Sequence, residues 1–167
     1  MRVLPSGSDF DGWVELLAVS SRRQAARRHL MSIGTRAVPA IRRGVHHVEP
    51  AVRRACVSML DQLIEDDALP DLVDALDDDD ADVVKRALHA LACDACTKGE
   101  CRPSDALWVD RAIVLAGSPD IDVRAGAIDA LGKAVERRAD VGDALSAIAD
   151  AERDPGLRSM ARRLAAR

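Results

Sequence analysis

The residues of this sequence best suited to chemistry lie close together near its middle. His89, Cys93, Cys96 and Cys101 follow one another with the spacing H-x3-C-x2-C-x4-C. One imidazole and three thiolates match a tetrahedral zinc site in number and type. His89 and Cys93 are four residues apart and therefore share one face of a helix. The sequence predicts a structural zinc ion held by these four side chains, in an insertion over residues 93–103.

Other states of this cluster stay open at the level of sequence. The cysteines could be free thiols, two of them could form a disulfide, or they could hold an iron–sulfur cluster. A catalytic zinc ion is disfavoured, because no acidic residue nearby forms a general-base motif. The remaining cysteine, Cys56, aligns with small apolar residues of an internal repeat, and we expect it to be buried packing.

Composition narrows the classes of function. Aromatic residues make up only 2% of the 167 residues, which disfavours RNA-recognition sheets and stacking platforms for single strands. The sequence contains no glycine-rich phosphate loop, no Ser-His-Asp set and no paired carboxylates, so an enzyme is disfavoured. No apolar run is long enough to span a membrane, and the first residues lack a signal peptide's apolar core, so we expect a cytoplasmic protein. The 21 arginines against 3 lysines suggest a bacterial source.

The elements that must position these residues come from an internal repeat. The segment 52–60 recurs, with shifts of 31, 40 and 34 residues, at 83–91, 123–131 and 157–165. Small residues coincide at Cys56, Ala87, Ala127 and Ala161. Each segment has apolar residues at helical spacing, and an acid just before it fits a helix N-cap.

Another helix precedes each of these four segments, which gives four helix pairs, and a less regular pair comes before them. The pairs are expected at residues 9–33, 36–64, 67–93, 104–137 and 140–167. A single pair cannot bury its apolar face alone, so neighbouring pairs must stack. The sequence therefore predicts one all-α domain over residues 1–167, a right-handed α-solenoid of about five pairs with the cysteine-rich insertion between the third and fourth.

A resemblance to a known family rests on the run Ile33-Gly34-x-x-Ala37-Val38-Pro39-Ala40-Ile41, followed by Asp/Glu-Pro-x-Val/Leu-Arg. This pattern resembles the short HEAT repeats of the phycobilisome-lyase type and covers nearly the whole chain. The resemblance implies that the second helices of the pairs line the concave side. Members of the family include scaffolds, chromophore lyase subunits and, more distantly, alkylpurine DNA glycosylases.

The resemblance also implies a ladder of arginines on the inner helices, at Arg53, Arg124 and Arg158, and Arg54 and Lys85 lie close to it. Such residues could bind a partner on the concave face. In repeats of this type the arginine often bonds instead to an acid of a neighbouring turn, and we favour that structural role. Lys85 stands one residue later than the arginines of the other pairs.

Charge is distributed unevenly along the chain, whose net charge is −4. Residues 1–60 carry ten basic residues against four acids, whereas residues 61–110 carry four against fifteen. We expect the basic third and the acidic middle to form separate surfaces that steer a charged partner.

The sequence therefore predicts a non-catalytic scaffold that binds a protein partner. One alternative is a nucleic-acid-binding protein, which would use the arginines of the basic third. These are Arg22, Arg23, Arg27, Arg28, Arg42, Arg43, Arg53 and Arg54. The net negative charge and the scarcity of aromatic residues oppose it. A second alternative is a lyase-type enzyme subunit, which the resemblance permits but no acid–base arrangement supports.

Overall fold

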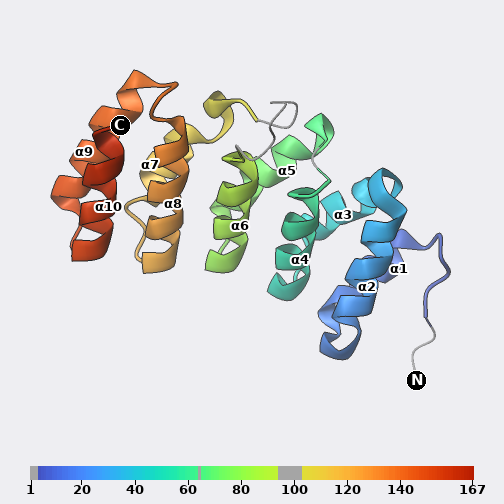
Figure 1. Ribbon diagram of the computed structural model, residues 1–167. Coiled ribbons are helices and arrows are strands. Elements are labelled where there is room, and N and C mark those ends of the chain that lie inside the picture. Colours follow the sequence, from blue (N-terminus) through green and yellow to red (C-terminus); the bar gives the residue numbers. More distant parts are fainter. Residues whose placement is uncertain (1–3, 64, 94–102) are drawn as a thin grey trace.

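The computed structural model describes residues 4–63, 65–93 and 103–167, and their regular elements are all helices (Figure 1). The α-helices are α1 Phe10–Glu15, α2 Ser20–Ile33, α3 Val38–Val45, α4 Pro50–Leu60, α5 Leu69–Asp74, α6 Ala81–Leu91, α7 Val109–Leu115, α8 Ile121–Ala134, α9 Ala139–Ala151 and α10 Pro155–Ala165. Short 3-10 helices lie at Leu16–Ala18, Gly34–Ala37, Asp66–Ala68, Ala75–Asp77 and Asp105–Leu107. In the described part of the chain, no helix combines the length and apolar character needed to cross a membrane.

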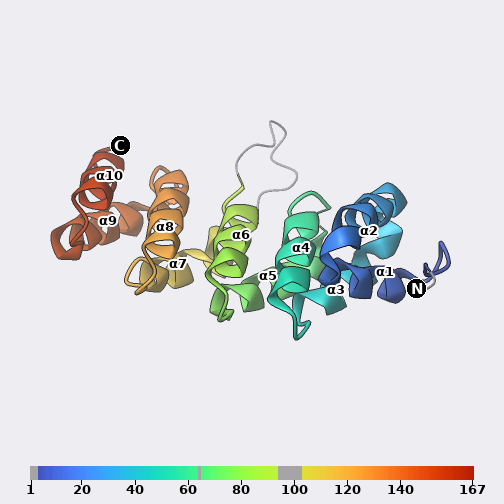
Figure 2. The same ribbon diagram turned by 90° about the horizontal axis from the view of Figure 1, so that it is seen from below.

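The helices stack as consecutive pairs in two layers (Figures 1 and 2). The second helices α2, α4, α6, α8 and α10 form one layer, and the first helices form the other. Neighbouring second helices pack on one another, α4 on α6, α6 on α8 and α8 on α10. The array follows a shallow arc whose hollow side carries the second helices (Figure 2). The predicted all-α solenoid is thereby confirmed.

The second helices begin where the sequence predicts. Asp80, Asp120 and Asp154 are the N-cap residues of α6, α8 and α10, and each side chain accepts from backbone N–H groups of the first turn. These bonds satisfy donors that a helix start otherwise leaves free. Glu49 holds the same place before α4 without a side-chain bond, and Pro50 follows it at the first helical position.

The repeated small position lies at the centre of the core. Its members, Ala26, Cys56, Ala87, Ala127 and Ala161, are all 0% exposed. Burial raises the pKa of the Cys56 thiol to about 12, so this cysteine stays protonated and unreactive at neutral pH. Cys56 is therefore packing, as predicted. A Cβ at Gly44 of α3 would collide with its sulfur, so the close contact between α3 and α4 requires glycine.

Candidate protein-binding site

A nearly buried arginine links α4 to the turn of the next pair. Arg53 lies four residues after the N-cap and donates to the two carboxylate oxygens of Asp78 over 2.7 and 2.8 Å. It also donates to the carbonyls of His47 and Val48 over 3.0 and 3.1 Å and to the carboxylate of Asp79 over 2.5 Å. Burial alone would raise the pKa of Asp78, but the hydrogen bonds from Arg53 and from a backbone N–H hold it below its usual value. The bond to Asp78 raises the pKa of Arg53 in turn.

The same arrangement recurs in other pairs. Arg124 donates to both carboxylate oxygens of Glu152 over 2.9 and 3.3 Å. Burial would raise the pKa of Glu152, but the hydrogen bonds from Arg124 and from backbone N–H groups together hold it below its usual value. Arg158 and Arg23 keep the backbone half of the motif, because each donates to the carbonyl six residues upstream, at Glu152 and Leu17. These arginines tie the start of a second helix to the turn before it, which is the structural role favoured from the sequence.

The third pair lacks this arginine. Val84 lies four residues after the N-cap of α6 and is 4% exposed. Ser118 stands where the partner acid would be, two residues before the N-cap of α8, and its hydroxyl accepts from the N–H of Asp120 over 3.2 Å. The arginine and its acid are thus absent together at the joint between α6 and α8.

Arg54 and Lys85 form a second, more exposed row one residue further along their helices. Arg54 lies 3.3 Å from Asp80 and 3.5 Å from Asp82. Lys85 lies 2.9 Å from Asp82 and 3.4 Å from Asp122. The hydrogen bond between Lys85 and Asp82 lowers the pKa of Asp82 and raises that of Lys85. Each basic side chain thus bridges the N-terminal ends of neighbouring second helices.

The basic residues predicted to bind a partner on the concave face therefore already have partners within the chain. Arg53, Arg54, Lys85 and Arg124 pair with carboxylates, and Arg158 donates to backbone carbonyls. Their hydrogen bonds explain why these residues recur without any external ligand. A direct role in holding a partner stays a prediction for these five residues.

Part of the basic first third is neutralised by acids of the middle, at α3 and α4. Arg42 donates to the carboxylate of Asp71 over 2.5 Å, and Arg43 donates to both carboxylate oxygens of Asp11. Stacking brings helices distant in sequence side by side, so opposite charges meet there, and separate surfaces stay a prediction for the remaining residues of the two regions. Half of the arginines on which the nucleic-acid alternative depends are neutralised in this way, those of α3 and α4.

An apolar groove of about 820 Å³ lies between α7 and α9. Both helices belong to the layer of first helices (Figure 2). α7 contributes Ile113 and Val114, and α9 presents Ala144, Ala147 and Ala151 at helical spacing. α9 packs on α10 and α8, and its alanines are too small to fill the space beside α7. Val114 is consequently 65% exposed at the edge of an apolar hollow.

Charged residues line one end of this groove and lie beyond the other. At the start of both helices, Arg138 lies 3.4 Å from Asp110 and also pairs with Asp140, so two carboxylates share one arginine. At the end of α9, Arg153 lines the groove and has no carboxylate partner in the described part of the chain. Arg124 also lines this end, with its charge neutralised as described above. The groove is thus basic at the end of α9, and the two carboxylates that share one arginine lie beyond its lining, at the start of both helices.

Two of the four predicted zinc ligands lie within the described residues. His89 is exposed on α6, with its Nε2 3.7 Å from a carboxylate oxygen of Asp61, and Cys93 follows the end of the helix, half-buried. Cys96 and Cys101 lie outside the described residues, so the zinc site stays a prediction. Within the described residues, no group of three or more His, Cys, Asp or Glu side chains is arranged to hold a metal ion.

The repeated pairs and the inter-repeat arginines define an α-solenoid of the HEAT class. Residues 11–92 match the family of HEAT repeats. The match assigns HEAT repeats to residues 11–92, and the same stacking of helix pairs continues through the rest of the described chain. A comparison with curated proteins finds none that matches this chain.

A comparison with solved structures finds a chain with the same fold. The chain is similar to one in "The structure of the complex of CpcE and CpcF of phycocyanin lyase from Nostoc sp. PCC7120", with a TM-score of 0.73 and 16% identity. The match covers 95% of this chain and 98% of that chain. The predicted resemblance to HEAT repeats of the phycobilisome-lyase type is confirmed at the level of the fold.

Sequence reasoning missed Arg23 and the groove between α7 and α9. A signal for Arg23 was present, because aligning Ala26 with Cys56 places Arg23 directly under Arg53. No comparable signal exists for the groove. Alanines at helical spacing on α9 fit a core-facing stripe equally well, and only the packing of α9 shows that they line a hollow.

Proposed function

We propose that this protein is a non-catalytic scaffold that holds a helix of a partner protein in the groove between α7 and α9. The observation that carries the proposal is Val114, a large apolar side chain that stays 65% exposed beside an apolar hollow. Apolar concave surfaces of this kind mark binding sites, and a groove between helices suits an amphipathic helix. Most other large apolar residues of the described chain are buried in one continuous core, and the exposed exceptions, such as Val48, lie outside the groove.

The charges near the two ends of the groove indicate which charged side chains the partner helix would carry. Near Asp110 and Asp140 the partner helix would carry Lys or Arg, and near Arg153 it would carry Asp or Glu. Between these ends its apolar side chains, spaced three and four residues apart, would contact Ile113 and Val114. Opposite charges at the two ends fix the direction in which the helix lies.

Two further observations support a binding role over catalysis. The charged groups in the groove wall, Arg124 and Glu152, are already paired with each other, and the remainder of the lining is mostly apolar. The matched chain belongs to a structure titled as a complex of two proteins, which makes a protein partner a natural expectation here. The proposal places the scaffold in the cytoplasm and keeps zinc as a structural element of the 93–103 insertion.

A comparison of captured proteins tests the proposal. Tagged protein is incubated with extract of the native host, as the unchanged chain and as the variants Val114→Asp and Ala147→Glu. Both positions are exposed, so a charge there blocks the groove without disturbing the core. A partner of the groove should be captured by the unchanged chain and lost with both variants.

The control is Val48→Asp, the same substitution at an apolar residue that is 84% exposed and lies outside the groove. This variant should retain the partner. If all the variants capture the same proteins as the unchanged chain, the groove is not the binding site and the proposal fails.

A further inference from the structure

The helix that forms one wall of the groove, α7, also has the features of an occupant. Asp110, Ile113 and Val114 are three and four residues apart on α7 and therefore share one face of the helix. Asp110 and Val114 are exposed, and Ile113 is half-buried. This face thus carries an acid at the start of the helix and apolar side chains one turn later.

The two helices that flank the groove run in the same direction. Arg138, directly before α9, lies 3.4 Å from Asp110 in the first turn of α7, so the starts of both helices lie together. Arg153 lines the groove beyond the end of α9 and has no carboxylate partner in the described part of the chain. A helix that lies in the groove antiparallel to α7 and α9 therefore has its first turn near Arg153.

The lining of the groove is complementary to the exposed face of α7. An antiparallel α7 from another molecule brings its Asp110 towards Arg153, and guanidinium groups pair closely with carboxylates. The same helix brings its Val114 over α9, where the groove is lined by Ala144, Ala147 and Ala151. These small side chains leave space for a valine, so an apolar side chain meets an apolar hollow.

We infer that the partner in the groove is a second copy of this chain, with α7 of each copy lying in the groove of the other. This assignment rests on the proposed function and names the helix that the groove holds. A two-fold axis perpendicular to the groove turns α7 of one copy antiparallel to α7 and α9 of the other. Every contact then forms twice, because one surface carries the acid, the arginine, the valine and the hollow.

Asp110 is available to a base from a second copy. Its side chain is 82% exposed, and its contact with Arg138 is as long as 3.4 Å. Arg138 pairs more closely with Asp140, and this hydrogen bond lowers the pKa of Asp140. Arg153 of the second copy would therefore give Asp110 a base that it does not share with another carboxylate.

Sedimentation equilibrium over a series of protein concentrations tests the inference. The unchanged chain should form dimers. Val114→Asp places a charge in the apolar contact twice per dimer and should raise the dissociation constant at least about tenfold. The control Val48→Asp, at an exposed apolar residue outside the groove, should change it by less than about twofold.

Charge reversal tests how the two copies pair. Asp110→Arg alone and Arg153→Asp alone each bring like charges together at both contacts, so each variant should dimerise about tenfold more weakly than the unchanged chain. An equimolar mixture of the two variants should recover the affinity, because every contact in a mixed dimer joins opposite charges.

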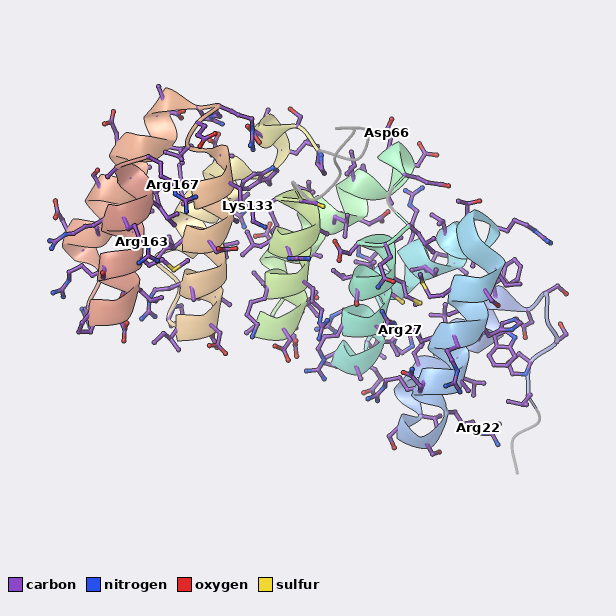
Figure 3. The ribbon with its side chains drawn as sticks, viewed as in Figure 1. Arg22, Arg27, Asp66, Lys133, Arg163 and Arg167 are labelled. Atoms are coloured by element: carbon purple, nitrogen blue, oxygen red, sulfur yellow. The ribbon has the colours of Figure 1, made fainter. Side chains whose placement is uncertain are left out.

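The matched control for charge is Arg163→Asp on α10, in the layer of second helices (Figure 3). Arg163 is exposed and, like Arg153, has no carboxylate partner among the described residues. This variant should change the dissociation constant by less than about twofold. Circular dichroism verifies that each variant keeps its helices.

Three outcomes overturn the inference. They are a monomeric unchanged chain, a dimer that Val114→Asp does not weaken, and a mixture of charge variants that associates no better than either variant alone. With a monomeric chain, the proposed function still stands if the groove variants lose a different host protein. The proposed function fails separately, when the groove variants capture the same host proteins as the unchanged chain.

Discussion

Removing Arg53 should destabilise the array far more than removing its neighbour Arg54. The side chains of Arg53 and Asp78 are only 12% and 9% exposed, whereas that of Arg54 is 36% exposed. Arg53→Ala leaves the Asp78 carboxylate without its main donor and frees two carbonyls of the preceding turn. Losing charge-assisted bonds at a nearly buried carboxylate should lower the free energy of unfolding by about 3 kcal/mol. Arg54→Ala should lower it by about 0.5 kcal/mol, as for an exposed ion pair.

Urea unfolding followed by circular dichroism measures both effects. A double-mutant cycle that combines Arg53→Ala with Asp78→Asn should give an interaction energy of about 1–2 kcal/mol. Each single variant leaves the other side chain nearly buried without its hydrogen-bond partner, whereas the double variant removes both charges. Equal losses for the Arg53 and Arg54 variants, or independent effects of Arg53 and Asp78, would refute the reasoning.

The pH dependence gives a second check on the same pair. The pKa of Asp78 is lower in the folded protein than in the unfolded chain, where it is about 4. The ion pair therefore contributes its full stabilisation above about pH 4, and this stabilisation is lost as the pH falls through the pKa of the folded state. The stability difference between the unchanged chain and Arg53→Ala should therefore be largest near neutral pH. It should shrink as the pH is lowered towards 3, and a difference that grows instead contradicts the assignment.

Three further predictions follow from the repeat pattern and the insertion. Val84→Arg places a charge at a nearly buried position and should lower the free energy of unfolding by about 2 kcal/mol. Adding Ser118→Asp supplies the missing acid and should recover about 1 kcal/mol, which urea titration of both variants would measure. Arg22→Glu should raise the free energy of unfolding by about 0.5 kcal/mol, because it replaces an unfavourable charge in the first turn of α2, and a lowered urea midpoint would argue against this. Elemental analysis of protein purified under reducing conditions should find zinc equimolar with the chain and lost in Cys96→Ser, with the helices retained; freely titratable thiols without metal would show that the insertion is only a loop.

The helices and their starts were predictable because their signals are local. The spacing of Val83, Ala87 and Leu91 on α6 reports one buried face, and Asp80 before it marks the first turn. Shifting this pattern along the chain locates every other second helix except α2. There Arg22 occupies the position of the apolar residue that opens the others.

The sites were less predictable because they depend on which helices meet. Arg42 and Asp71 belong to regions of opposite charge in the sequence, yet they pair directly across adjacent first helices. The groove arises because α7 and α9 do not pack against each other, and the alanines of α9 give no sign of this in the sequence. The charge of a solenoid surface can therefore be predicted from the sequence only when the ion pairs between its own helices are known.

Site-specific photocrosslinking tests most directly the claim that a partner protein occupies the groove. A photoreactive phenylalanine analogue replaces Ala147, which lines the groove and is exposed, or Val48, which lies outside the groove. Irradiation in the native host should join a discrete protein to the chain from position 147, and Val114→Asp should abolish that adduct. An adduct equally strong from position 48, or none from position 147, would contradict the groove as the scaffold's binding site.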